Sequence, residues 1–231
     1  MKKAKKVLTL LLCAALLVGA TITGTLAFLT QTTETVTNTF TVGKVQLGED
    51  SDGDGIVEGG LDEAKVDVYG RRLKSDDTVF DEENDDEKDL AKRVTVNTYK
   101  LIPGHTYVKD PTIHVAKGSE PCYLFVKVTN PITGIEATGD TTIAKQMENN
   151  GWAPLAGVTD TYYKTTTVST TEDAGEDVDV FGSFTLDDNA DVSTYAGQTI
   201  TVVAYAIQAD GFTTAADAWS AAPSTWGVTT P

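Results

Sequence analysis

The sequence has few of the residues from which catalytic sites are usually built. It contains two cysteines and two histidines, which are Cys13, Cys122, His105 and His114. No H-E-x-x-H pair, G-x-S-x-G turn or glycine-rich phosphate loop occurs, so no zinc protease, serine hydrolase or nucleotide-binding enzyme is indicated. We therefore expect no enzyme, no catalytic residue and no required cofactor, and we interpret both histidines as structural or surface residues.

Basic residues are also scarce, with 18 lysines and arginines against 34 acidic residues and a net charge of −16. Four of the lysines lie among the first six residues, so the rest of the chain is still more acidic. A surface of this charge repels nucleic acid and anionic membranes, which excludes both as electrostatic partners. Cations and basic proteins stay open as partners.

The chain begins with lysines, followed by the apolar run 7–20 and by small residues at Thr25 and Ala27. This order is typical of a secretory signal peptide and predicts cleavage between Ala27 and Phe28. The alternative is an uncleaved anchor, but the run is shorter than the ~20 apolar residues of a spanning helix. We expect residues 1–27 to be removed and no stable membrane anchor to remain.

Removal of Cys13 with the signal leaves Cys122 as the single cysteine of the mature chain. No internal disulfide can then form, so stability must come from the packing of an apolar core. Cys122, Leu124, Val126 and Val128 share one strand face through the period of two. We interpret Cys122 as a small buried residue, the alternative being a reactive or bridging thiol.

Alternation of apolar and polar residues predicts an all-β domain with short strands. The strands that we expect between the acidic region and the C-terminus are 90–101, 112–116, 122–130, 158–169, 178–186 and 197–209. The last of these is apolar on both faces, which favours a central position in its sheet. A short helix is expected at 141–150, with Asp140 or Thr141 as its N-cap and Gly151 after its end, and a helical turn at 213–221. The chain after residue 27 suffices for a single domain, 28–231, built as an antiparallel β-sandwich.

Residues 30–41 contain seven threonines, and this β-branched composition favours an extended strand. In such a strand Val36, Asn38, Phe40 and Val42 lie on one face. Gly43 then shifts the register so that Val45 and Leu47 continue that face, as a bulge would. The segment is either an ordinary first strand or an exchangeable strand that adds to another subunit.

Residues 49–89 form an acidic insertion that holds half of the 34 acidic residues. Within it, Asp50, Asp52, Asp54 and Glu58 match positions 1, 3, 5 and 9 of a Ca²⁺-binding loop. Position 12 is Leu61, where a bidentate glutamate is needed, and no flanking helices are evident, so this is not an EF-hand. Ca²⁺ is therefore the one candidate cofactor, and the alternative is a solvated Asp/Gly turn.

Several stretches resemble the TasA/camelysin family. The most specific is LVGATITGTLAFLT at 17–30 with NTFTVGKV at 38–45. Looser similarities are LIPGHTYVKDPTIHV at 101–115, CYLFVKVTN at 122–130 and TITVVAYAIQADGFTTAADAWS at 199–220. The resemblance implies a secreted β-sandwich of jelly-roll type, with one or two short helices, that a Gram-positive bacterium exports through a specialised signal peptidase. It also implies assembly into extracellular biofilm-matrix fibres by donation of the N-terminal strand to the next subunit.

Three functional hypotheses follow. The first is a structural fibre subunit whose partners are copies of itself or related matrix subunits, with the segment from Phe28 to Leu47 as the assembly strand. The second is a monomeric Ca²⁺-binding cell-surface module. The third is a hydrolase, because the camelysin branch has been described as metalloproteases, but the zinc-binding histidine pair of such enzymes is missing from this sequence.

Overall fold

A computed structural model of the chain describes residues 44–48 and 59–226. The predicted signal peptide, its predicted cleavage site between Ala27 and Phe28, and the predicted strand face lie outside the described residues, as does the candidate Ca²⁺ loop. The residues concerned in the strand and the loop are Val36, Asn38, Phe40, Val42, Asp50, Asp52, Asp54 and Glu58. The chain divides into two units, Met1–Val42 and Gly43–Pro231, and the description below concerns the second.

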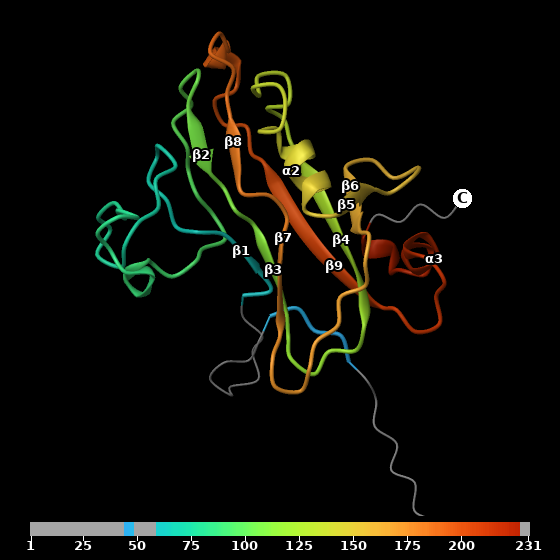
Figure 1. Cartoon of the computed structure of the whole chain (residues 1–231). Helices are drawn as coiled ribbons and strands as arrows, with labels where there is room; N and C mark the ends of the chain where they lie inside the picture. The colour runs from blue at the N-terminus through green and yellow to red at the C-terminus, as the bar shows by residue number, and fades with distance from the viewer. Residues whose placement is uncertain (1–43, 49–58, 227–231) are drawn as a thin grey trace, which may run out of the picture. The chain divides into compact units, whose positions relative to one another are not determined.

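The described residues form antiparallel β-sheets with two α-helices, which confirms the expected all-β class. One sheet has the order β1-β3-β7, formed by Leu61–Asp62, Thr112–Val115 and Glu176–Asp179. Strands β2, Thr106–Val108, and β8, Ser183–Thr185, pair with each other just before β3 and just after β7 in the chain (Figure 1).

A second sheet has the order β5-β6-β4-β9. Its strands are Trp152–Pro154, Thr161–Lys164, Cys122–Thr129 and Thr201–Gln208 in that order. Strand β4 pairs with β6 on one side and along its whole length with β9 on the other. Three short 3-10 helices complete the described elements, η1 at Glu87–Asp89, η2 at Val192–Thr194 and η3 at Ser224–Trp226.

Both predicted helical segments are confirmed, as α2, Ile143–Asn149, and α3, Ala215–Ser220. The N-cap of α2 is Thr142 and not Asp140 or Thr141, because the Thr142 hydroxyl accepts a hydrogen bond from the Lys145 amide at 3.3 Å. Gly151 follows the helix with φ of +79°, the left-handed conformation that favours glycine after a helix end.

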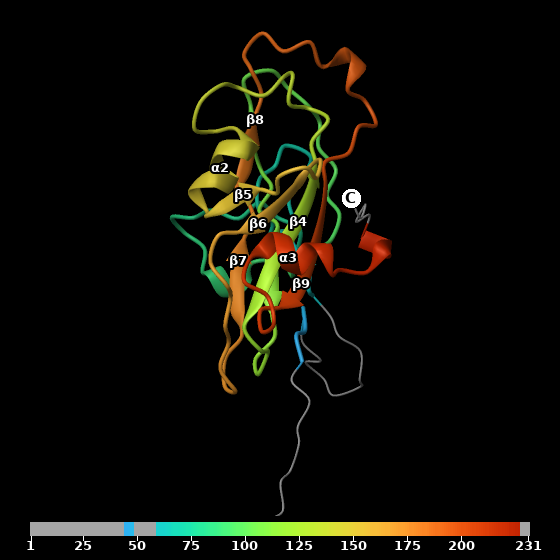
Figure 2. The ribbon, with the colours of Figure 1, turned by 90° about the vertical axis from the view of Figure 1, so that its right-hand side faces the viewer.

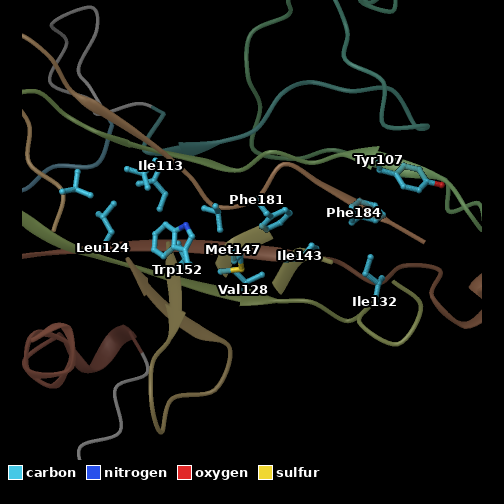
Figure 3. Packing of buried hydrophobic residues seen from close by; sticks show 14 of the residues in the cluster. Tyr107, Ile113, Leu124, Val128, Ile132, Ile143, Met147, Trp152, Phe181 and Phe184 are labelled. Carbon is cyan, nitrogen blue, oxygen red and sulfur yellow. The ribbon is translucent and has the colours of Figure 1, made fainter. Parts of the chain in front are cut away.

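The main core lies against one face of β4. Cys122, Leu124, Val126 and Val128 all contribute to it, which confirms the predicted strand face. They meet Val178 of β7 and side chains from β3, α2 and β5, among them Ile113, Met147 and Trp152 (Figure 3). Burial raises the pKa of the Cys122 thiol to about 11, so little thiolate is present at neutral pH and the residue behaves as a small apolar side chain.

The opposite face of the same sheet is covered by α3 (Figure 2). Phe125 of β4 points to this side and lies with its ring centroid 5.0 Å from that of Trp219. Ala215, Ala218 and Leu155 complete the buried part of this second cluster. The four-stranded sheet is therefore apolar on both faces, because each face has its own covering layer.

The prediction of a strand at 90–101 is wrong. Only isolated bridges occur there, from Val94 to Glu63 and from Leu90 to Lys74. Val96, which the alternation placed on a buried face, is 77% exposed. The Asn97 side chain instead accepts a hydrogen bond from the amide of Val66 and donates one to the carbonyl of Ala64, at 3.1 and 2.9 Å. Such side-chain bonds to the backbone compete with a β-ladder.

Candidate functional site

Strand β9 lies at the edge of its sheet, so the prediction that it is central is wrong. Its partner among the described residues is β4, in a continuous register from Thr129 opposite Thr201 to Cys122 opposite Gln208. Edge strands usually carry charges, proline or a bulge that prevents further pairing. The stretch TITVVAYAIQ at 199–208 contains neither a charged residue nor proline, and its register has no bulge.

Every second residue of β9 directs its backbone groups away from β4. Cys122 exchanges hydrogen bonds of 2.8 and 2.9 Å with Val168, on the side of β4 away from β9. The direction of the backbone N–H and C=O groups alternates along antiparallel strands. In β9 these groups therefore point away from β4 at the residue opposite Cys122 and at every second residue before it. These residues are Gln208, Ala206, Ala204 and Val202. Their outward N–H and C=O groups have no partner among the described residues.

The core is incompletely covered along this edge. Leu124 and Val126 of β4 are fully buried, whereas their neighbours Val202, Ala204 and Ala206 on β9 are only partly buried. Other partly buried apolar side chains pack against the same core, and they include Val45, Leu47, Leu61, Tyr99, Leu101, Val192, Tyr195 and Ile200. Core-facing side chains that stay partly in water can be buried further by an added segment.

On one side, β5 and the end of α2 connect the two sheets through hydrogen bonds. The Trp152 indole donates to the carbonyl of Asp179 at 2.9 Å, and the Asn150 amide donates to the carbonyl of Val180 at 3.2 Å. These bonds tie β5 and the end of α2 to β7 and the residue after it. On the other side the two sheets end in β1 and β9.

A groove of about 570 Å³ lies where β9 begins. It is lined by residues 96–99, Leu101, Val192 and residues 195–200, together with Lys109, Ile132 and Phe184. Apolar side chains in this lining include Leu101, Tyr99, Tyr195 and Ile200, and polar ones include Thr98, Gln198 and Thr199. The groove thus continues the open edge of β9 into the space beside the core.

One buried ion pair borders this groove. Lys109 Nζ lies 2.6 Å from Glu63 Oε2, and the two side chains are 10% and 6% exposed. Asn97 donates from Nδ2 to the other carboxylate oxygen of Glu63 at 2.8 Å. The ammonium has three donors, and the bond to Glu63 is its only hydrogen bond among the described residues. No sequence pattern indicated this cluster, because its members are 34 and 46 positions apart.

The N-terminal segment reaches the described part of the chain at Lys44. The amides of Ala116 and Glu120 donate to the carbonyls of Gln46 and Lys44, both at 2.9 Å, and Leu47 pairs with Val115. Val45 and Leu47 pack against the main core as partly buried side chains. Residues 44–48 therefore belong to the folded body, including Val45 and Leu47 from the end of the predicted assembly strand.

His114 lies between two carboxylates on the outer face of the β1-β3-β7 sheet. Its Nδ1 is 2.7 Å from Asp177 Oδ1 and its Nε2 is 3.0 Å from Asp62 Oδ1. Arg93 also donates to Asp62 Oδ1, at 2.5 Å, and to the carbonyl of Asp110. Burial alone lowers the pKa of His114, but the hydrogen bonds and charges of Asp62 and Asp177 outweigh it and raise the pKa. His105 has a structural contact of another kind, since its Nε2 lies 2.8 Å from the carbonyl oxygen of Tyr69.

The raised pKa predicts that the stabilising effect of His114 depends on pH. The effect is full below the pKa of an unfolded histidine, about 6.5, and is lost as the pH rises through the higher pKa of the folded state. We expect His114→Asn to lower the melting temperature more at pH 5 than at pH 9, measured by circular dichroism. Asp177→Asn keeps the ring and should remove part of this pH dependence. An equal loss at both pH values would contradict the assignment.

In the described parts of the chain, no cluster of three or more histidine, cysteine, aspartate or glutamate residues is arranged to hold a metal ion. Within the same residues, no helix has the length and apolar character needed to cross a membrane. Comparisons of the chain with models of known protein families, with curated proteins and with solved structures found no match.

Proposed function

We propose that the protein is a secreted structural subunit of extracellular biofilm-matrix fibres. Residues 36–42 of one copy add as a strand to β9 of the next copy. The observation that carries the proposal is the edge of β9, an apolar strand of eight residues with outward backbone groups and no protecting charge. Unprotected edges of this kind are sites of strand addition. In this proposal the fold is a jelly-roll sandwich of two layers. One layer consists of β1-β3-β7 together with β2-β8, and the other consists of β5-β6-β4-β9.

The composition of the donated segment supports the proposal. Between Phe28 and Gly43 the sequence contains a single charged residue, Glu34. A nearly neutral, threonine-rich strand can approach the edge of β9 without repulsion, although the chain as a whole carries a charge of −16. Backbone hydrogen bonds then provide affinity, and the alternate side chains Val36, Phe40 and Val42 cover the partly buried core.

A proline in the outward-facing part of β9 tests this assignment. The N–H of Ala204 points to the open edge, so Ala204→Pro removes a donor that an added strand requires and breaks no bond to β4. We expect fibres of the mature protein to grow at least about tenfold more slowly, because a lost hydrogen bond and a steric clash act together. Growth is followed by light scattering and electron microscopy.

Ala204→Val is the matched control, since it retains the N–H. Both variants should melt within a few degrees of the wild type, which shows that the fold is intact. Growth of the proline variant at the wild-type rate would exclude the β9 edge as the acceptor.

A further inference from the structure

Lys109 is the one charged residue among those that line the groove beside β9. Lys109 is buried, and among the described residues its only hydrogen bond is to Glu63, so two ammonium donors are left without a partner there. The other carboxylate oxygen of Glu63 accepts a hydrogen bond from Asn97 instead of from Lys109. A buried donor without an acceptor costs free energy. A ligand of this groove should therefore carry a hydrogen-bond acceptor at the position of Lys109.

The donated segment has the complementary pattern. On the face formed by Val36, Asn38, Phe40 and Val42, three side chains are apolar and one is an amide. The Asn38 side chain offers a carbonyl oxygen as acceptor and an amide nitrogen as donor. This face of the segment thus carries one hydrogen-bond acceptor among apolar side chains, and the groove presents the donors of Lys109 that have no partner in the described part of the chain.

We propose that Asn38 of the incoming strand binds the cluster of Glu63, Asn97 and Lys109 in the acceptor copy. Its Oδ1 accepts a hydrogen bond from Lys109 Nζ, and this contact fixes the register of the strand on β9. The proposal rests on the proposed function, because it requires that residues 36–42 occupy the groove. A strand displaced by two residues would place an apolar side chain against the ammonium, and a strand displaced by one would turn the whole face outward.

This register also places the neighbours of Asn38 on apolar surface. Val36 and Phe40 stand two residues to either side, about 7 Å away along a strand. One of them lies over Ile200 and Val202 at the start of β9, and the other lies against Tyr99 and Tyr195 in the groove. The arrangement holds for either direction of the added strand. A single buried polar contact that selects one register among several apolar ones is a known device in coiled coils.

Competition by synthetic peptides tests the contact without altering the folded body. Mature full-length protein is allowed to form fibres in the presence of a peptide of residues 30–43, which should occupy the groove and block growth. Three peptides are compared, namely the natural sequence, Asn38→Leu and Thr39→Leu. The Thr39 change is equally apolar but lies on the opposite face of the strand.

We expect the natural and Thr39→Leu peptides to halve the growth rate at similar concentrations. The Asn38→Leu peptide should need about tenfold more or beyond, because a hydrogen bond to a charged group is lost. Equal potency of the Asn38→Leu peptide would overturn the register proposal and leave strand donation standing. Fibres that grow undisturbed by all three peptides would overturn strand donation itself, and the register proposal with it.

Discussion

A chain that begins at Gly43 will stay monomeric under conditions in which the chain that begins at Phe28 forms fibres. The shorter chain keeps residues 44–48, whose bonds to Ala116 and Glu120 and whose contacts with the core belong to the folded body. It loses only the segment that we propose to be donated. Because the edge of β9 then has no strand to accept, fibre growth should stop completely and not merely slow down. Light scattering and electron microscopy of the two chains at equal concentration give the measurement.

A point variant separates the chemistry of the segment from its length. Phe40→Asp in the full-length mature chain places one charge on the apolar face of the donated strand. Burying that carboxylate without a partner costs several kcal/mol, so this variant should also fail to assemble. The melting temperature of its folded body should match that of the wild type, because Phe40 lies outside the unit Gly43–Pro231. Fibres from the chain that begins at Gly43 would contradict strand donation.

The same experiment addresses the hypothesis of a monomeric Ca²⁺-binding module. If both chains stay monomeric in the presence of calcium, at low pH and at high concentration, the fibre function fails. A rise in melting temperature on addition of Ca²⁺, reversed by a chelator, would then assign the function to the loop with Asp50, Asp52, Asp54 and Glu58. The absence of any calcium effect would remove that hypothesis as well.

Local sequence patterns were sufficient to predict the buried face of those elements whose surroundings are uniform along their length. In β4 the period of two placed Cys122, Leu124, Val126 and Val128 on one buried face. In α2, Ile143 and Met147 lie one turn apart and are both buried. Each of these elements has a continuous partner surface, so burial follows the intrinsic period of strand or helix.

The edge position of β9 could not be predicted from its composition. Apolar residues on both faces normally indicate a central strand, and both faces of β9 do have a covering layer, the main core and α3. Face composition reports what lies above and below a strand, whereas edge position depends on which strands pair beside it. That pairing is set by segments distant in the sequence.

The cluster of Glu63, Asn97 and Lys109 beside the groove could not be predicted from the sequence for a related reason. Glu63 belongs to the acidic insertion, where half of all acidic residues lie and where charged residues are expected to face water. It is nevertheless only 4% exposed. Its partners Asn97 and Lys109 lie 34 and 46 positions further along the chain, one of them in a segment for which the alternation predicted a strand. A contact of this kind is created by the tertiary fold alone.

Replacement of Lys109 by methionine should produce the largest loss of stability of any single change in the ion pairs of the folded body. Both side chains of the Lys109 and Glu63 pair are at least nine-tenths buried. The variant retains the aliphatic stem but leaves the Glu63 carboxylate with the Asn97 amide as its one partner among residues 44–48 and 59–226. Loss of one member of a buried pair typically costs about 3–5 kcal/mol, because the remaining charge stays buried without compensation. Urea denaturation followed by tryptophan fluorescence measures this free energy of unfolding.

Two controls show whether the cost comes from the uncompensated charge. Lys65 forms an ion pair with Asp77 in which the side chains are 39% and 68% exposed, so Lys65→Met should change stability by less than about 1 kcal/mol. The double variant Lys109→Met with Glu63→Leu removes both charges and should recover most of the stability lost in the single variant, since two apolar side chains replace the pair. A Lys109→Met variant as stable as Lys65→Met would mean that water reaches Glu63. In the wild-type protein the Lys109 ammonium would then be hydrated too. Asn38 of the donated strand would have no buried donor to bind.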